Sequence, residues 1–162
     1  MFEDILEANS RYVAGFSLKG LEPSAARGLG VVTCIDSRIE PLAMLGLVPG
    51  DAKILRNAGA RVTDDVLRSL VLATNLLGVE RICIVAHTQC RMAGTTDEEI
   101  RAALGNTPDA AAMEFLAINN QLETLNADVD LVRNCSLIPA DTAVAGFIYD
   151  VGSGLLAPQS GI

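Results

Sequence analysis

The sequence has no tryptophan, a single histidine and few aromatic residues, which make up 4% of its 162 positions. Half of the residues are nevertheless hydrophobic. The apolar material is therefore mainly Ala, Val, Leu and Ile, which suits helices packed on a buried parallel sheet. Basic residues are also scarce, with 12 Lys and Arg against 20 Asp and Glu and a net charge of −8. This balance argues against nucleic acid or an anionic membrane as the main partner.

Long hydrophobic runs and export signals are missing as well. The apolar stretches 66–77 and 81–86 are too short or too interrupted to span a bilayer. Residues 1–12 carry charges throughout and lack a basic start followed by an apolar segment, so no secretory signal is predicted. The four cysteines show no Cys-x-x-Cys spacing, which favours a metal in a reducing compartment over disulfides. We therefore expect a cytoplasmic protein that does not associate with membranes.

Short apolar runs alternate with helical patterns along the chain. Strands are predicted at 30–33, 52–56, 82–86, 132–138 and 144–151, and helices at 2–15, 42–45, 64–77, 97–104 and 109–126. This alternation predicts a single domain over 1–162, of α/β class, with a mainly parallel central sheet flanked by helices. The mean hydropathy of +0.35 is high for a small chain. We therefore expect a homo-oligomer in which the N-terminal helix, 1–16, packs on a partner subunit.

Two motifs follow two of the predicted strands. Cys34-Ile35-Asp36-Ser37-Arg38 comes after the first strand, and His87-Thr88-Gln89-Cys90 comes after the strand at 82–86. If these strands are parallel neighbours, both motifs emerge at the carboxyl edge of the sheet, where α/β folds bind ligands. Thiolate and imidazole are the ligands that zinc prefers. Cys34, His87 and Cys90 would supply three ligands and leave a fourth position for water, as in a catalytic zinc site.

The alternative is that Cys34, His87 and Cys90 bind no metal and have no common role. A His-x-x-Cys pair arises often by accident, and buried cysteines behave as small hydrophobic residues. Two features favour the metal: His87 is the only histidine in the chain, and Cys34 begins a Cys-x-Asp-x-Arg motif. Cys83, in the middle of a predicted strand, and Cys135 have no such neighbours, and we expect both to belong to the core.

Asp36 and Arg38 lie on the same side of the chain if the local backbone is extended. In the catalytic interpretation, Arg38 orients Asp36, which accepts a hydrogen bond from a metal-bound hydroxide. In a second interpretation the two residues form an ordinary salt bridge at the end of the strand. In a third, Asp36 is a fourth zinc ligand that closes the site. The sequence leaves all three open.

The motifs together resemble those of the β-class carbonic anhydrases. The resemblance rests on Cys34-x-Asp36-Ser37-Arg38, Arg56-Asn57-Ala58-Gly59 and His87-x-x-Cys90, and it is dense from about residue 29 to 92. The compact bacterial members are most similar. The resemblance implies a β-carbonic-anhydrase-like fold, Zn²⁺ held by Cys34, His87 and Cys90, and a catalytic dyad of Asp36 and Arg38. It also implies an obligate homodimer, or a dimer of dimers, with active sites near the subunit interface.

The activity implied by the resemblance is the reversible hydration of CO2 to bicarbonate and a proton by metal-bound hydroxide, which makes the protein a zinc lyase. Two alternatives keep the metal: a hydrolase of carbonyl sulfide or carbon disulfide, and a catalytically weak or metal-sensing zinc protein. The sequence departs from the family pattern at Arg91, where glycine is usual, and at Gln89, where Asp is frequent. Arg91 is expected to crowd the backbone near the metal or to compete for Asp36.

Overall fold

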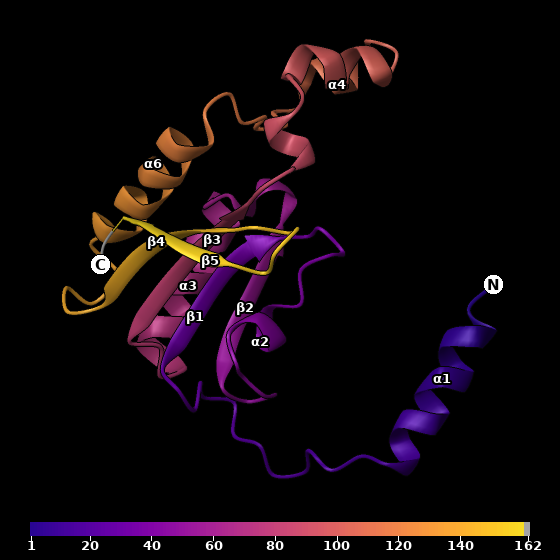
Figure 1. Cartoon of the computed structure of the whole chain (residues 1–162), viewed down its shortest axis with the longest axis vertical. Coiled ribbons are helices and arrows are strands. Elements are labelled where there is room, and N and C mark those ends of the chain that lie inside the picture. Colours follow the sequence, from indigo (N-terminus) through magenta and orange to yellow (C-terminus); the bar gives the residue numbers. More distant parts are fainter. Residues whose placement is uncertain (161–162) are drawn as a thin grey trace.

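A five-stranded sheet forms the centre of the molecule (Figure 1). The structure is a computed structural model that describes residues 1–160, so the last two residues of the predicted domain, 161 and 162, lie outside the described residues. The elements are, in order, α1 (Glu3–Ala14), β1 (Leu29–Cys34), α2 (Pro41–Met44), β2 (Ala52–Asn57), η1 (Ala58–Ala60), α3 (Asp64–Leu76), β3 (Arg81–His87), η2 (Arg91–Ala93), α4 (Asp97–Ala103), α5 (Pro108–Ala112), α6 (Gln121–Arg133), β4 (Ala143–Tyr149) and β5 (Leu156–Ser160).

The strand order is β2-β1-β3-β4-β5. The first four strands run parallel, and β5 pairs with β4 in the antiparallel direction. The predicted α/β fold with a mainly parallel sheet is thus confirmed. The predicted adjacency of the two motif-bearing strands is confirmed too, because Thr33 of β1 lies opposite Val85 of β3. Both strands therefore end at the same edge of the sheet.

The two faces of the sheet are buried by different elements. All six residues of β1 are buried, as expected for a run of small and β-branched residues in the middle of a parallel sheet. On one face, Val32 and Ile84 pack with the apolar stripes of α3 and α6. On the other face, Val31 and Val85 pack with α2 and the strands around them. Burial on both faces makes β1 and β3 the rigid centre of the fold.

The predicted helix 109–126 is wrong, because the structure has two helices there, α5 and α6, separated by a loop at 113–120. Leu116 in this loop has a φ of +59°, which no helix accommodates. Asn120 then starts a new helix, since its side chain accepts hydrogen bonds from the backbone N–H groups two and three residues further on. This N-cap sets the beginning of α6.

The strand predicted at 132–138 is also wrong, since α6 continues to Arg133. Leu125, Val129 and Val132 recur at helical spacing and are at most 3% exposed, so they form the buried stripe of α6. Ile138 belongs to the same core without being part of a strand. The error arises because a short apolar run at the end of a buried helix resembles a buried strand.

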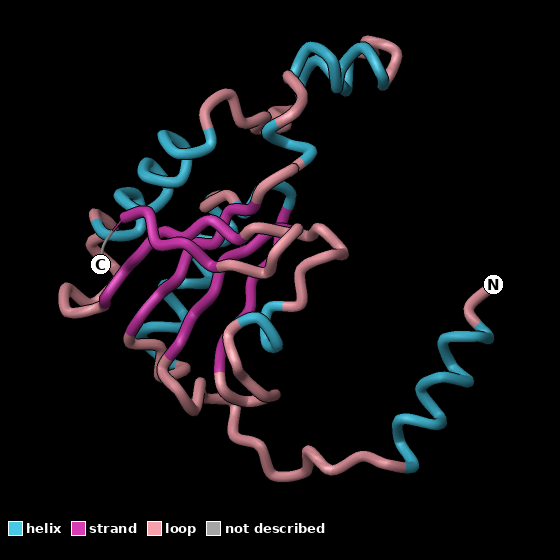
Figure 2. Tube along the Cα trace, in the orientation of Figure 1, coloured by secondary structure: helices cyan, strands magenta, loops and turns pink. Residues whose placement is uncertain are grey.

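Helix α1 confirms the predicted N-terminal helix but stands away from the sheet, at the end of a long irregular segment (Figures 1 and 2). None of its residues is buried against the described part of the chain. Phe2, Ile5, Leu6 and Val13 are between 59% and 67% exposed. Helix α1 therefore carries an apolar stripe that residues 1–160 leave uncovered. Within those same residues, no helix combines the length and apolar character needed to cross a membrane.

The packing of α3 on the sheet predicts how much stability is lost when a buried side chain of this helix is shortened. Leu70 is fully buried, whereas Leu72 on the same helix is 43% exposed. We expect Leu70→Ala to lower the free energy of unfolding by about 3 kcal/mol, because it removes buried methyl groups and leaves a void. Leu72→Ala should cost less than about 1 kcal/mol. Equilibrium urea unfolding at equal protein concentration measures both, and equal losses would contradict this account of the core.

Candidate metal centre

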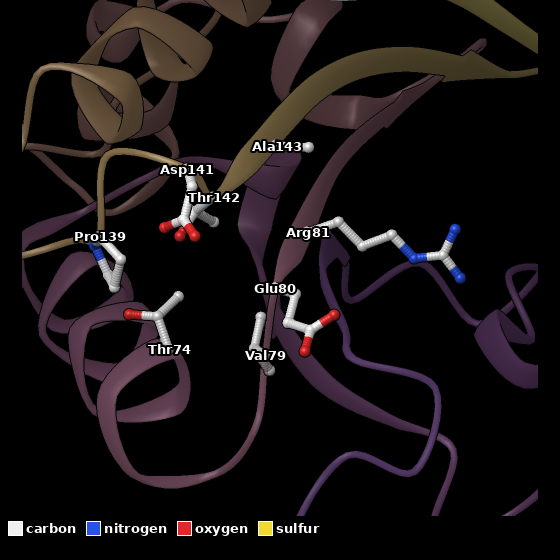
Figure 3. Close-up of a pocket in the computed structure, with 8 residues that line it drawn as sticks. All are labelled: Thr74, Val79, Glu80, Arg81, Pro139, Asp141, Thr142 and Ala143. Atoms are coloured by element: carbon white, nitrogen blue, oxygen red, sulfur yellow. The ribbon is translucent and has the colours of Figure 1, made fainter.

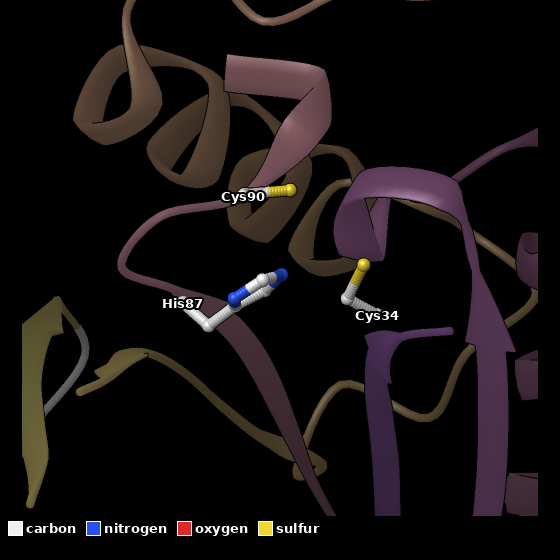
Figure 4. A group of neighbouring side chains, drawn as sticks. All are labelled: Cys34, His87 and Cys90. Atoms are coloured by element: carbon white, nitrogen blue, oxygen red, sulfur yellow. The ribbon is translucent and has the colours of Figure 1, made fainter. Parts of the chain in front are cut away.

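Two thiols and one imidazole meet where β1 and β3 end. Cys34 is the last residue of β1, His87 is the last residue of β3, and Cys90 follows one turn later. Their ligand atoms all lie within 4.8 Å of one another, and all three residues are buried. Figure 4 shows both sulfur atoms and the imidazole ring turned toward one point. The structure thus brings together the three predicted metal ligands.

The orientation of the His87 ring fits a metal ligand. Nδ1 lies 2.9 Å from the backbone oxygen of Thr88, which can only accept a hydrogen bond, so Nδ1 carries the proton. Nε2 is buried and has no hydrogen-bond partner within residues 1–160. A buried nitrogen with a free lone pair, next to two sulfur atoms, is the arrangement expected of a zinc ligand whose other nitrogen is fixed by a backbone carbonyl.

The spacing of the ligand atoms also suits zinc. Bonds of about 2.3 Å to sulfur and about 2.0 Å to nitrogen in a tetrahedron place the ligand atoms roughly 3.5–4 Å apart. In the structure the ligand atoms lie within 4.8 Å of one another, so a small inward movement of the side chains would bring them to this spacing. The donor set, two sulfurs and one nitrogen, is the set that favours zinc over magnesium or calcium.

The three side chains change one another's protonation. A hydrogen bond from the Cys90 thiol holds the pKa of Cys34 well below its usual range, although burial opposes this. The same interaction, together with burial, raises the pKa of Cys90. The Cys34 sulfur raises the pKa of His87, although the Nε2 contact lacks the geometry of a regular hydrogen bond. The two thiols therefore share one negative charge, and a divalent cation bound by both would displace the remaining proton.

Asp36 is held beside this centre by Arg38. Arg38 Nη2 donates to Asp36 Oδ2 at 2.7 Å, and Arg38 Nε and the Arg38 backbone N–H both donate to Oδ1, at 3.0 and 2.9 Å. These bonds hold the pKa of Asp36 well below its usual range and raise the pKa of Arg38. Both carboxylate oxygens thus face the guanidinium, and Asp36 is not one of the three grouped ligands.

The two residues that depart from the family pattern lie in different surroundings. Gln89 adopts a left-handed φ of +56°. Its side-chain Oε1 accepts a hydrogen bond from Arg38 Nη1 at 3.0 Å, and its backbone oxygen accepts one from Nη2 at 3.2 Å. Arg91 is exposed, and its charge helps to lower the pKa of Glu99. The groups that shift the pKa of Asp36 are Arg38 and His87. Arg91 is therefore not among the groups that shift the pKa of Asp36.

Several supporting contacts come from residues without a predicted role. Arg56 of β2 donates to the backbone oxygens of Cys34 and Asp36, at 2.9 and 2.8 Å. Gln121, the first residue of α6, donates to the backbone oxygen of His87 at 2.8 Å. Arg56 begins the Arg-Asn-Ala-Gly motif that contributed to the family resemblance, although the sequence gave it no role in the site. Gln121 gave no such signal, because the sequence pattern placed it inside the wrongly predicted helix 109–126.

The remaining cysteines and an open hollow of the surface lie apart from this centre. Cys83 and Cys135 are half-buried and pack against the core, as predicted. An open hollow of about 670 Å³ lies at the opposite edge of the sheet. Figure 3 shows that its lining comes from the starts of β3 and β4 and from α3, with Glu80 and Asp141 as its acidic residues. This hollow is therefore at the far end of the strands from the predicted ligands.

The chain is similar to known carbonic anhydrases. A family model described as carbonic anhydrase matches residues 29–108. β-Carbonic anhydrase 1 of Mycobacterium tuberculosis is 32% identical over 159 residues, which cover 95% of this chain and 94% of that protein. The carbon disulfide hydrolase of an Acidianus species is 34% identical, over 77% of this chain and 74% of that protein. The crystal structure of a carbonic anhydrase from Streptococcus mutans has a TM-score of 0.90 and 38% identity, covering 98% and 97% of the two chains.

The geometry of the three ligands predicts which cysteines hold the metal. We expect Cys34→Ser to lower the zinc content by about tenfold or more, because a hydroxyl is a poor substitute for a thiolate ligand. Cys83→Ser and Cys135→Ser, which change cysteines outside the cluster, should keep the parent's zinc content. Elemental analysis of the purified proteins, with circular dichroism as a check on folding, measures this. Full zinc content in Cys34→Ser would contradict the assignment.

Proposed function

The chain belongs to the β-carbonic anhydrase family, and from this premise we propose that it catalyses the reversible hydration of CO2 to bicarbonate and a proton. The proposal assigns Cys34, His87 and Cys90 as zinc ligands, and Asp36 and Arg38 as the catalytic dyad. The observation that carries it is the buried cluster of three ligand atoms with the free Nε2 of His87, next to an ionised carboxylate.

Zinc held by these residues would supply Lewis-acid activation of a water molecule close to CO2. The thiolates of Cys34 and Cys90 would neutralise the charge of a bound zinc ion, so a nearby hydrogen-bond acceptor would be needed to hold the activated water. Asp36 is suited to this role. Its Oδ1 takes two hydrogen bonds from Arg38, while Oδ2 takes one at 2.7 Å and keeps a free lone pair. We therefore assign Oδ2 as the acceptor of a hydrogen bond from the activated water.

Arg38 is assigned two tasks toward Asp36. Its charge keeps the carboxylate deprotonated, and its fork of N–H groups fixes the plane of the carboxylate. His87 does not carry protons away in this mechanism, because Nδ1 donates its proton to the Thr88 oxygen and Nε2 would bind the metal. Since His87 is the only histidine, the released proton passes to the solution buffer or to a carboxylate.

The identity of the substrate has one specific rival. The relative from Acidianus is named carbon disulfide hydrolase. Carbon disulfide and carbonyl sulfide are linear and apolar like CO2, and the same activated water could attack them. We favour CO2 because the match to β-carbonic anhydrase 1 extends over 95% of this chain, against 77% for the hydrolase.

Substitution of Asp36 tests the mechanism. We expect Asp36→Ala to lower the CO2 hydration rate by about 100-fold or more, because the hydrogen-bond acceptor that orients the activated water is lost. Zinc content should stay at the parent level. Asp141→Asn, an exposed carboxylate at the opposite edge of the sheet, is the control and should keep the full rate. Stopped-flow hydration with a pH indicator, combined with zinc analysis, measures both.

Two results would count against this proposal. A parental hydration rate in Asp36→Ala would remove the dyad from the mechanism. If the parent protein binds zinc but releases hydrogen sulfide from carbon disulfide faster than it hydrates CO2, the rival substrate is the correct one. A headspace assay for hydrogen sulfide on the same preparations makes this comparison.

We propose further that the protein is a cytoplasmic homodimer, or a dimer of dimers, in which α1 packs on a partner subunit. The exposed stripe of Phe2, Ile5, Leu6 and Val13 supports this, since apolar stripes of this kind mark interaction surfaces. The cysteine-rich metal centre and the absence of disulfides among the described cysteines suit a reducing compartment. Residues 1–160 are assigned to one domain.

The apolar stripe of α1 can be tested by changing its polarity. We expect the double variant Ile5→Glu/Leu6→Glu to dissociate, because it places two carboxylates in the proposed apolar interface. The double variant Glu7→Gln/Arg11→Gln changes the polar side of the same helix and should keep the parental mass. Light scattering coupled to size-exclusion chromatography reports the mass of each. An unchanged mass for Ile5→Glu/Leu6→Glu would exclude this role for α1.

A further inference from the structure

The turn that follows β2 reaches the sulfur of Cys34. The backbone N–H of Gly59 donates to Cys34 Sγ at 3.4 Å. Gly59 has a φ of +83°, and the next residue, Ala60, has a φ of +60°. Gly59 adopts this conformation readily, but a residue with a Cβ does not. The left-handed conformation of Ala60 is therefore disfavoured by its own side chain. Contacts with other parts of the chain have to hold the turn in this conformation.

Two sets of contacts hold this turn closed. The Asn57 side chain bridges it, because Nδ2 donates to the backbone oxygen of Arg61 at 2.7 Å and Oδ1 accepts from the Arg61 N–H at 2.8 Å. The Arg61 guanidinium then bonds Asp128 of α6, with Nε to Oδ2 at 2.8 Å and Nη2 to Oδ1 at 3.4 Å. Arg61 thus joins the turn to a helix on the face of the sheet.

The ion pair of Arg61 and Asp128 is built into the interior. The side chain of Asp128 is 6% exposed and that of Arg61 is 21% exposed. A buried carboxylate needs its partner, because it has lost its hydration. Helix α6 packs its apolar stripe on the sheet, so Asp128 is a fixed point. A displacement of the turn would leave this carboxylate without its cation.

We propose that Arg61 and Asp128 are positioning residues that hold the Gly59 amide against the sulfur of Cys34. This inference rests on the proposed role of Cys34 as a zinc ligand. An N–H donor stabilises the charge on a thiolate, so the sulfur gives less charge to the metal and the metal stays a stronger Lewis acid.

Cobalt substitution reads this interaction directly. Co²⁺ in a site with thiolate ligands shows sulfur-to-metal charge-transfer absorption, whose energy falls when a hydrogen bond to the sulfur is lost. We expect Asp128→Asn to shift this band of the cobalt-loaded protein to longer wavelength. It should also weaken the apparent zinc affinity by about tenfold, measured by competition with a chromogenic chelator. Arg61→Lys keeps the charge but loses the fork of N–H groups, and it should give a smaller shift in the same direction.

An exposed ion pair supplies the matched control. Asp65 pairs with Arg68 on the surface of α3 at 2.7 Å, and Asp65→Asn should change neither the band nor the zinc affinity. If Asp128→Asn does not fold, the charge-transfer band and the zinc affinity of Arg61→Lys test the inference instead. A parental band in both variants, or an equal shift in Asp65→Asn, overturns the inference. Absence of thiolate charge transfer in the parent protein overturns the zinc-site proposal instead, so the two failures are distinguishable.

Discussion

The alignment of β1 with β3 is the constraint on which the rest of the site depends. Parallel pairing of Thr33 with Val85 brings the ends of the two strands to one edge of the sheet. Cys34 and His87, far apart in the sequence, then face one another without any long loop. Because both strands are buried on both faces, the positions of these side chains are set by the core. A metal centre placed here is assembled before the metal arrives, which reduces the entropy lost on binding.

The neighbouring elements fix the backbone on each side of the ligands. Arg56 of β2 holds the carbonyl of Cys34, and Gln121 of α6 holds the carbonyl of His87. Arg56 also holds the carbonyl of Asp36, so one guanidinium ties the first ligand to the dyad. These two supporting side chains come from a strand and from the start of a helix. Both donate hydrogen bonds to backbone carbonyl oxygens of the site residues. This arrangement restricts movement of the ligands and of Asp36 together.

Patterns among neighbouring residues were sufficient to predict most of the fold and the three candidate ligands. They were not sufficient to predict the side chains that hold the backbone of those ligands in place. The capping box of Thr96 and Glu99 and the apolar run of β1 act through neighbouring residues, so the sequence displays them. The beginning of α6 depends on Asn120 and on packing against the sheet, and the weak periodicity there gave one long helix instead. Gln121 contacts the centre only because α6 begins where it does. Such long-range contacts leave no periodic trace in the sequence.

The neutral amide at Gln89 is consistent with the electrostatics of the dyad. Arg38 carries a single positive charge, and it donates both to Asp36 and to the oxygens of Gln89. Because Gln89 accepts these hydrogen bonds without a negative charge, the charge of Arg38 remains available to keep Asp36 deprotonated. A carboxylate at position 89 would compete with Asp36 for the same guanidinium. Gln89 thus orients Arg38 without placing a second negative charge beside its guanidinium.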